Sequence, residues 1–263
     1  MRIFQVDAFT DTPFSGNPAG VCLLDEPKDD GWMQAVAAEM NLSETAFLLM
    51  EKAGYRLRWF TPTIEVELCG HATLSTAHVL YEIGEAEPAE PIEFQSRSGT
   101  LGARWDSDHD RVVLDLPARP TEPAPIPSEI SRALGIQAVA GGRVGKLHLI
   151  EIASEEAVRS MKPDFQTLRT FPGRGVMVTS RASTRGFDFV SRYFAPWIGI
   201  DEDPVTGSAH CALAPYWNAR LGKTEMLAYQ ASPRGGVVHV RLDGDRVHLG
   251  GQARTVIVGE LLA

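Results

Sequence analysis

Apolar and polar residues alternate along many short stretches of this chain, as expected for strands that bury one face. In the first part of the chain this alternation predicts strands at 3–8, 45–50, 55–60, 92–95, 100–105 and 111–116. In the second part it predicts strands at 175–179, 186–193, 236–242 and 246–249. Helical periodicity occurs at 29–39, 72–83 and 209–221. The pattern as a whole predicts an α+β fold.

The pattern is also repeated. The segment QSRSG at 95–99 is matched by QASPRG at 230–235, and DRVVL at 110–114 is matched by DRVHL at 245–249. RWFTP at 58–62 is matched in the same order by RYFAP at 192–196, and GHA at 70–72 by GSA at 207–209. Matches that keep their order and spacing favour a tandem duplication over chance. We therefore expect two similar halves, each with strands around one central helix.

A proline-rich segment separates the two repeats. Residues 117–127 contain five prolines, which cannot donate hydrogen bonds to a sheet, so we expect an extended linker. This places an N-terminal half at 1–117 and a C-terminal half at 118–263. Two such halves imply a pseudo-twofold axis with a cleft between them, and small ligands commonly bind in clefts of this kind.

Composition narrows the possible partners. The 263-residue chain has a net charge of −9 and no basic patch, which disfavours nucleic acid. Apolar runs fall short of the roughly 20 residues that span a bilayer, and the alternating N-terminus does not resemble a signal peptide. Three cysteines do not make a disulfide framework. We therefore expect a cytoplasmic protein without a membrane or nucleic-acid partner.

Two predicted helices begin with a glycine-bearing turn, at Gly70 and at Gly207. The first N–H groups of a helix lack partners within the helix and lie at its positive end, so they bind carboxylates or phosphates readily. The alternative is simple capping, with Thr206 or Ser208 satisfying its own helix. The duplication favours a ligand role, because both halves place the same kind of turn at the same point.

Three polar residues are candidates for acid/base chemistry. Glu44 precedes an apolar strand outside the predicted helices; it is either a solvated loop residue or a carboxylate whose pKa is raised by burial beside the cleft. His71 either orients a carboxylate or serves as a surface or capping histidine. Asp203 precedes Pro204 and is either a turn residue or a second carboxylate.

Other kinds of site lack support. His71 and His78 stand seven positions apart without a third ligand at suitable spacing, so no metal site is expected. The segment GGRVGK at 141–146 departs from the phosphate-loop pattern, because Ala140 and Leu147 occupy two required positions. No GxGxxG motif follows a strand, so no dinucleotide cofactor is expected.

Taken together, five short motifs resemble the phenazine-biosynthesis isomerase (PhzF-like) family. In chain order they are Asp7-Ala-Phe9, Gly16-Asn17-Pro18, Ser43-Glu44-Thr45, Cys69-Gly-His-Ala-Thr73 and Asp203-Pro-Val-Thr-Gly-Ser208. The resemblance covers essentially the whole chain. It implies the diaminopimelate-epimerase fold, in which two pseudo-symmetric halves each wrap a β-barrel-like sheet around a central helix.

The resemblance also implies roles for individual residues. It makes Glu44 the catalytic acid/base, with Asp203 and His71 beside it. It places the remaining motif residues around the substrate, namely Ser208, Gly70, Gly207, Thr73 and Asn17. The implied reaction moves a proton on a small carboxylate-bearing metabolite without a metal or an organic cofactor. The family also implies a homodimer.

Two alternatives stay open. The first is an epimerase or racemase on the same fold. Its two-cysteine form fits poorly, because Thr206 occupies the position that mirrors Cys69, and Cys211 lies inside the second helix. The second alternative is a non-catalytic small-molecule-binding or scaffold protein. It would not need Glu44, His71, Asp203 and Ser208, and the presence of all four favours an enzyme.

Overall fold

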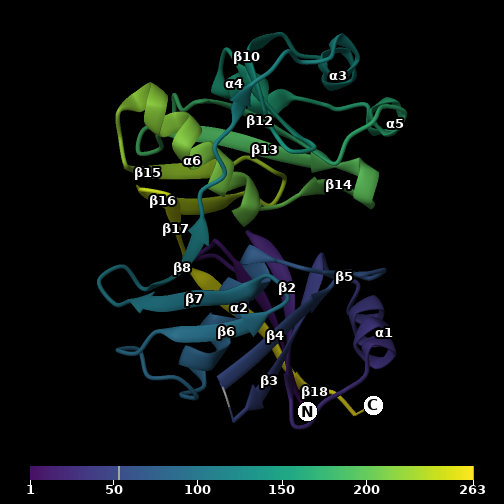
Figure 1. Ribbon diagram of the computed structural model, residues 1–263, viewed down its shortest axis with the longest axis vertical. Helices are drawn as coiled ribbons and strands as arrows, with labels where there is room; N and C mark the ends of the chain where they lie inside the picture. Colours follow the sequence, from purple (N-terminus) through teal and green to yellow (C-terminus); the bar gives the residue numbers. More distant parts are fainter. Residues whose placement is uncertain (53, 263) are drawn as a thin grey trace. The chain divides into compact units, whose positions relative to one another are not determined.

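The computed structural model describes residues 1–52 and 54–262, and the chain in it forms two compact units (Figure 1). The first unit comprises Met1–Leu116 together with the chain from His248 onward, and the second comprises Pro117–Val247. Each unit combines parallel and antiparallel strands with helices, so the predicted α+β class is confirmed.

The strands of the first unit are arranged around one helix, α2 (Gly70–Glu82). Its strands are β1 (Arg2–Ala8), β2 (Asn17–Leu24), β3 (Glu44–Glu51), β4 (Gly54–Phe60), β5 (Glu65–Val66), β6 (Ile92–Ser96), β7 (Gly99–Asp106), β8 (Arg111–Pro117) and β18 (Ala253–Glu260). Its helices are α1 (Asp30–Met40) and α2 (Gly70–Glu82). The pairs β2–β3 and β4–β6 are parallel, whereas β1–β2, β3–β4, β6–β7 and β7–β8 are antiparallel.

The second unit repeats this plan. Its strands are β9 (Glu122–Pro123), β10 (Ala138–Val144), β11 (Leu147–Ile152), β12 (Gly175–Arg181), β13 (Phe189–Ala195), β14 (Ile200–Asp203), β15 (Glu225–Gln230) and β16 (Gly236–Asp243), after which β17 (Arg246–Gly251) carries the chain back to the first unit. Its helices are α3 (Ser128–Leu134), α4 (Glu155–Ser160), α5 (Phe165–Arg169) and α6 (Gly207–Leu221), with a 3₁₀ turn at Pro196–Ile198. The parallel pairs are β11–β12 and β13–β15, at the same places in the order as in the first unit. The topology therefore supports the duplication that the sequence predicts.

The two repeats exchange their last strands. β9 follows the first repeat along the chain and pairs with β10 of the second unit. β18 follows the second repeat and pairs with β1 along its whole length, from Arg2↔Glu260 to Ala8↔Ala253. The sequence places the second half at 118–263, whereas the second unit ends at Val247. The difference arises because β1 takes β18 as its second neighbour.

The proline-rich segment is less free than the sequence suggests. Pro123 lies in β9 opposite Gly142, and Ala124 donates its N–H to the carbonyl of Gly141 (3.2 Å). Arg119 donates its N–H to the carbonyl of Cys211 (2.9 Å). A proline can occupy an edge strand because its carbonyl still accepts a hydrogen bond. The segment is thus attached to the second unit.

The central helices are α2 and α6, and each is largely buried. Nine residues of α2 are buried on several of its sides, and the helix lies against β1, β2, β3, β7 and β18. Nine residues of α6 are buried as well. A helix that is buried on several sides belongs in a core rather than on a surface. These positions agree with the predicted helices at 72–83 and 209–221.

The third predicted helix is α1, and its ends are set by local capping. Asp29 accepts a hydrogen bond from the N–H of Trp32 (2.8 Å) at the start, and Asn41 has the left-handed conformation at the end. These are standard start and stop signals. α1 lies against β3 and β4, where Phe47 and Phe60 meet edge to face at 5.5 Å between ring centroids.

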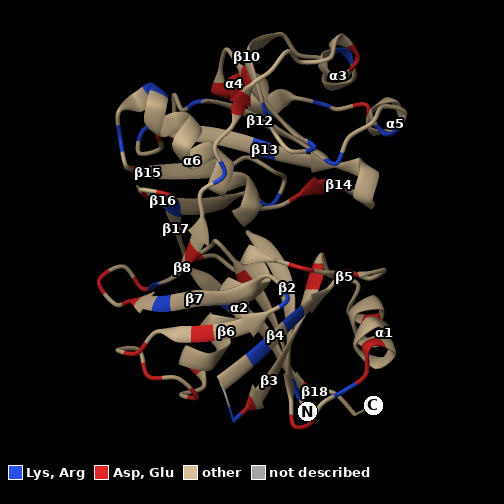
Figure 2. Ribbon diagram, in the orientation of Figure 1, with Lys and Arg blue, Asp and Glu red and all other residues tan. Residues whose placement is uncertain are grey.

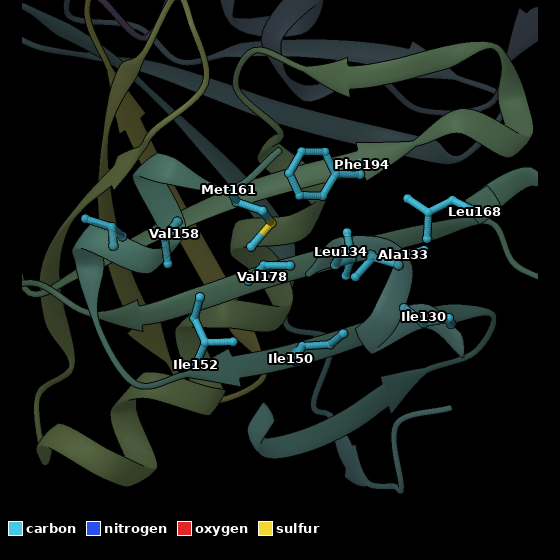
Figure 3. Packing of buried hydrophobic residues seen from close by; sticks show 12 residues of the cluster. Ile130, Ala133, Leu134, Ile150, Ile152, Val158, Met161, Leu168, Val178 and Phe194 are labelled. Atoms are coloured by element: carbon cyan, nitrogen blue, oxygen red, sulfur yellow. The ribbon is translucent and has the colours of Figure 1, made fainter. Parts of the chain in front are cut away.

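The second unit has a comparable outer layer. A cluster of buried residues joins the shorter helices α3, α4 and α5 to β11, β12 and β13 (Figure 3). Its members shown there include Ile130, Val158, Leu168, Val178 and Phe194. The sequence predicts none of these three helices, because each has only five to seven residues and provides little periodicity.

One predicted strand is displaced. The sequence places it at 186–193, whereas β13 begins at Phe189. Gly186 has a φ of +98° and lies in the turn before the strand. Such a conformation suits glycine and interrupts an extended strand.

Among the described residues, no helix combines the length and apolar composition that crossing a bilayer requires.

Candidate active site

Five side chains of the first unit lie in one polar contact group, which we call the Glu44 cluster. Its members are Asn17, Ser43, Glu44, Cys69 and His71. They come from the start of β2, the start of β3 and the start of α2. The fold therefore brings together residues from three separate predicted motifs, as a common site requires.

Glu44 is the first residue of β3, at the point where the chain enters the core. Its parallel partner on β2 is Ala19, and its side chain is 13% exposed. Glu44 Oε2 lies 3.3 Å from Nε2 of His71. The solvated-loop interpretation is therefore wrong, and the interpretation as a largely buried carboxylate next to a histidine is supported.

His71 is the second residue of α2 and is 4% exposed. Burial lowers the pKa of its imidazole to about 3, because the charged form loses its hydration. The ring is therefore neutral near pH 7, with a proton on one nitrogen only. A neutral imidazole can donate one hydrogen bond and accept one, which suits it to orient a carboxylate.

Cys69 occupies the position before α2 and is also buried. Its Sγ lies 3.5 Å from Nδ1 of His71 and 4.0 Å from Nε2. Cys22 and Cys211 are free thiols as well, and burial raises the pKa of Cys22 to about 11 and that of Cys211 to about 12. Cys211 lies inside α6, 3% exposed, so it does not mirror Cys69.

The cluster has donor types that zinc accepts in proteins. One ligand atom each from Glu44, Cys69 and His71 lie within 4.8 Å of one another. Carboxylate, thiolate and imidazole are all zinc ligands. The spacing of residues in the sequence does not suggest this combination, because Glu44 is far along the chain from Cys69 and His71. The three side chains could therefore bind a metal ion together. The reaction proposed below does not need one.

Asn17 is fully buried at the start of β2. Its Nδ2 lies 3.1 Å from Nδ1 of His71, and its Oδ1 lies 3.4 Å from the hydroxyl of Ser43. Gly16 before it has a φ of +66°, and a Cβ at that position would lie 2.1 Å from the carbonyl oxygen of Ala8. Only glycine fits there. The amide expected to bind substrate is thus engaged with the histidine.

The first backbone N–H groups of α2 can donate hydrogen bonds to a ligand. The residue before the helix makes no side-chain capping bond, and the first intrahelical bond is donated by the N–H of Thr73 to the carbonyl of Cys69 (3.1 Å). The hydroxyl of Thr73 donates to the same carbonyl (2.6 Å). Thr73, expected near the substrate, is 1% exposed and contributes to helix geometry, whereas Gly70 is half-buried.

In the second unit, Asp203 ends β14, a strand with three acidic residues in four positions (Figure 2). Asp203 is 9% exposed, and its Oδ2 accepts a hydrogen bond from the hydroxyl of Thr206 (2.5 Å). The Thr206 hydroxyl is thereby used outside its helix, and α6 has no side-chain cap. The capping interpretation of Thr206 is therefore wrong. Gly207 is buried at the helix start, and Ser208 beside it is half-buried.

Gln230 holds this acidic loop in place and is not among the candidates from the sequence. Its Oε1 accepts the N–H of Thr206 (2.9 Å), and its Nε2 donates to the carbonyl of Asp203 (2.7 Å) and to the Thr206 hydroxyl (3.2 Å). The residue is fully buried. The repeated glutamine at 95 and 230 is the signal that could have identified it.

Each unit thus gathers its own share of the predicted residues. The first unit holds Asn17, Glu44, Gly70, His71 and Thr73, and the second holds Asp203, Gly207 and Ser208. Within the first unit, Glu44, His71 and Asn17 are in direct contact. Within the second, Asp203 and Gly207 flank the loop that Gln230 anchors.

Relatives of the chain are found across bacteria and mammals. The family model for phenazine biosynthesis-like protein (PhzC-PhzF) matches residues 6–259. A protein of Halalkalibacterium halodurans named as an uncharacterized isomerase is 50% identical over 261 residues, covering 99% of this chain and 98% of that protein. The human phenazine biosynthesis-like domain-containing protein is 40% identical over 289 residues, covering 100% and 99%.

Solved structures agree with this similarity. A phenazine biosynthesis protein of the PhzF family from Enterococcus faecalis superimposes with a TM-score of 0.94 at 41% identity, covering 100% of this chain and 99% of that one. A hydroxyproline epimerase from Agrobacterium vitis superimposes with a TM-score of 0.65 at 13% identity, covering 98% and 91%, which extends the likeness of fold to epimerases. The expected epimerase-like fold is thereby confirmed, and the chain belongs to the phenazine biosynthesis-like (PhzF) protein family.

Proposed function

We propose that the protein is a cofactor-independent isomerase that moves a proton on a small carboxylate-bearing metabolite, with Glu44 as the group that carries the proton. The observation behind the proposal is the contact between Glu44 Oε2 and Nε2 of His71 at 3.3 Å, in a largely buried setting. Family membership and relatives named as isomerases support an isomerase or epimerase role.

The proposed step begins with Glu44 as a carboxylate. It accepts a proton from a substrate carbon, and the electron pair of the broken C–H bond moves into the substrate's unsaturated system. The same carboxyl group then returns the proton to a different carbon, so no redox partner is needed. His71 is neutral because of burial, and its Nε2 lies 3.3 Å from Oε2, close enough for a protonated Nε2 to orient the carboxylate during the step.

Substrate binding is assigned to the start of α2. The N–H groups of Gly70 and His71 precede the first intrahelical hydrogen bond, donated by Thr73, and no side chain caps this end. They can therefore donate to a substrate carboxylate next to the Glu44 cluster, to which His71 itself belongs. Negative charge that develops on the substrate during proton removal would be stabilised by the same helix end.

For the second unit, the proposal assigns binding roles to Gly207 and Ser208 and a catalytic role to Asp203. Support comes from the buried position of Asp203 and from the anchoring of its loop by Gln230. An uncapped helix start at Gly207 repeats the arrangement at Gly70. These roles stay predictions.

An epimerase of the two-thiol kind is disfavoured by the residues themselves. Thr206, not cysteine, precedes the second helix, and Cys211 is buried within α6 with a pKa raised to about 12. An epimerase that uses Glu44 as one of its bases differs from the proposed isomerase only in where the proton returns. The test below separates the two.

Deuterium exchange tests the proposal. The protein is incubated in deuterated water with a pool of small carboxylic acids that includes dihydro-hydroxyanthranilate, and carbon-bound protons are followed by NMR. We expect deuterium to enter one compound with the wild type and with Glu39→Gln, a matched change at an exposed position of the same unit. Glu44→Gln should abolish exchange while the melting temperature stays nearly unchanged.

The outcomes have distinct meanings. Label at a new carbon indicates isomerisation, whereas label at the original carbon with inverted configuration indicates epimerisation. Equal exchange by wild type and Glu44→Gln would refute the role of Glu44. Ligand-induced shifts in the protein without any exchange would favour a binding protein, and a large loss of stability in Glu44→Gln would make the residue structural.

A further inference from the structure

Each ring nitrogen of His71 lies close to a polar side chain, a carboxylate at Nε2 and an amide at Nδ1. Nε2 faces Oε2 of Glu44 at 3.3 Å, and Nδ1 faces Nδ2 of Asn17 at 3.1 Å. Cys69 Sγ lies 3.5 Å from the same Nδ1. All of these residues belong to the first unit. Which ring nitrogen carries the proton therefore depends on whether each neighbouring group donates or accepts a hydrogen bond.

The donors and acceptors permit one consistent arrangement with an ionised Glu44. A carboxylate only accepts, so a hydrogen bond across the 3.3 Å between Oε2 and Nε2 requires a proton on Nε2. A neutral ring protonated on Nε2 has a bare Nδ1 that needs a donor, and the amide nitrogen of Asn17 only donates. The hydroxyl of Ser43 completes the chain by donating to Oδ1 of Asn17 (3.4 Å).

Turning the amide by half a rotation reverses every assignment. The oxygen of Asn17 would then accept a proton on Nδ1, and Nε2 would become an acceptor. Glu44 could then bond to the ring only as a protonated acid. The orientation of one buried amide is thus linked to whether Glu44 is ready to remove a proton or to give one.

We propose that Asn17 is a positioning residue that keeps His71 protonated on Nε2 and thereby keeps Glu44 as a carboxylate before substrate binds. The proposal rests on the function proposed above, because it deepens the role of Glu44. Asn17 acts through His71, since its amide is engaged within the cluster. The substrate-binding role that the family resemblance implies for Asn17 stays a prediction.

The tautomer can be measured without a substrate. Long-range ¹H–¹⁵N correlation spectra of the full-length protein at pH 7 distinguish a protonated ring nitrogen from a bare one, and His71→Gln assigns the signals by their loss. We expect a protonated Nε2 and a bare Nδ1 in the wild type. Asn17→Asp should shift Nδ1 to the protonated position, because a carboxylate in place of the amide can only accept.

Asn41→Asp is the matched control, since it makes the same chemical change at an exposed position of the same unit, in a conformation that aspartate tolerates. Its His71 signals should equal those of the wild type. Ser43→Ala should also leave Nδ1 bare, and a reversal there would assign the control of the tautomer to Ser43 instead.

A wild-type Nδ1 that is protonated would overturn the proposal, and this result does not depend on whether any variant folds. An Asn17→Asp protein that folds, as judged by its amide spectrum, and keeps a bare Nδ1 would overturn it as well. Failure of the deuterium-exchange experiment leaves the tautomer result intact. The two proposals therefore fail separately.

Discussion

Replacing Glu155 by glutamine should destabilise the protein by an amount that depends on pH. Glu155 begins α4 and is 3% exposed. Its carboxylate accepts hydrogen bonds from the backbone N–H and hydroxyl of both Ser183 and Thr184, and from Arg159. A glutamine keeps one acceptor oxygen and turns an NH₂ group toward these donors. The helix would thereby lose its attachment to the turn between β12 and β13.

The magnitude follows from the pKa. Burial by itself would raise the pKa of Glu155, but the hydrogen bonds from Thr184, Arg159 and Ser183 outweigh it and lower the pKa from 4.5 to about 2. At about 1.4 kcal/mol per pH unit, this difference corresponds to about 3 kcal/mol of stability at pH 7. Because the folded-state pKa is lowered, the contribution is fully present above pH 4.5 and is lost as the pH falls toward 2.

Urea unfolding at pH 7 and at pH 3 provides the assay. Glu155→Gln should unfold about 3 kcal/mol more easily than the wild type at pH 7, and the difference should narrow to about 1 kcal/mol at pH 3. The exposed neighbour Glu156 is the control, and Glu156→Gln should change stability by less than about 0.5 kcal/mol at either pH. An equal loss at both pH values for Glu155→Gln would refute the electrostatic reasoning.

Two further predictions concern the candidate site. Cys69→Ala should retain most deuterium exchange, because the proposed step does not use the thiol; complete loss would revive a thiol mechanism. Gln230→Ala removes three buried hydrogen bonds around Asp203 and should lower the free energy of unfolding by about 2–4 kcal/mol in urea titrations. Its counterpart in the repeat, Gln95, is exposed, and Gln95→Ala should cost less than about 0.5 kcal/mol; similar losses at both positions would contradict the anchoring role.

Local signals in the sequence were sufficient for α1 and insufficient for β10. Each end of α1 is set by the residue directly next to it in the chain, Asp29 before the helix and Asn41 after it. Both ends can therefore be predicted from sequence. β10 contains Gly141, which is unfavourable in an isolated strand. In the structure a Cβ on Gly141 would lie 2.6 Å from both Ala124 and Ile126, because that segment passes directly over it. Such an approach cannot be predicted from neighbouring residues.

The candidate site shows the same division. Glu44 and His71 could be selected by residue type, motif and the family resemblance, but their contact depends on how β3 and α2 are packed. Asn17 was expected to face substrate, and its partner His71 lies 54 positions away. Hydrogen bonds between distant residues determine which polar side chains are available to a ligand, and a single sequence carries little information about them.

The exchange of β18 has a consequence for how the protein folds during synthesis. Domains usually fold in the order in which they leave the ribosome. Here the second unit is one continuous stretch, whereas β1 in the first unit obtains its second neighbour only from β18, which is translated after the second unit. One edge of β1 must therefore stay unpaired while the downstream unit is made, and the unit that bears Glu44 is completed after the second unit.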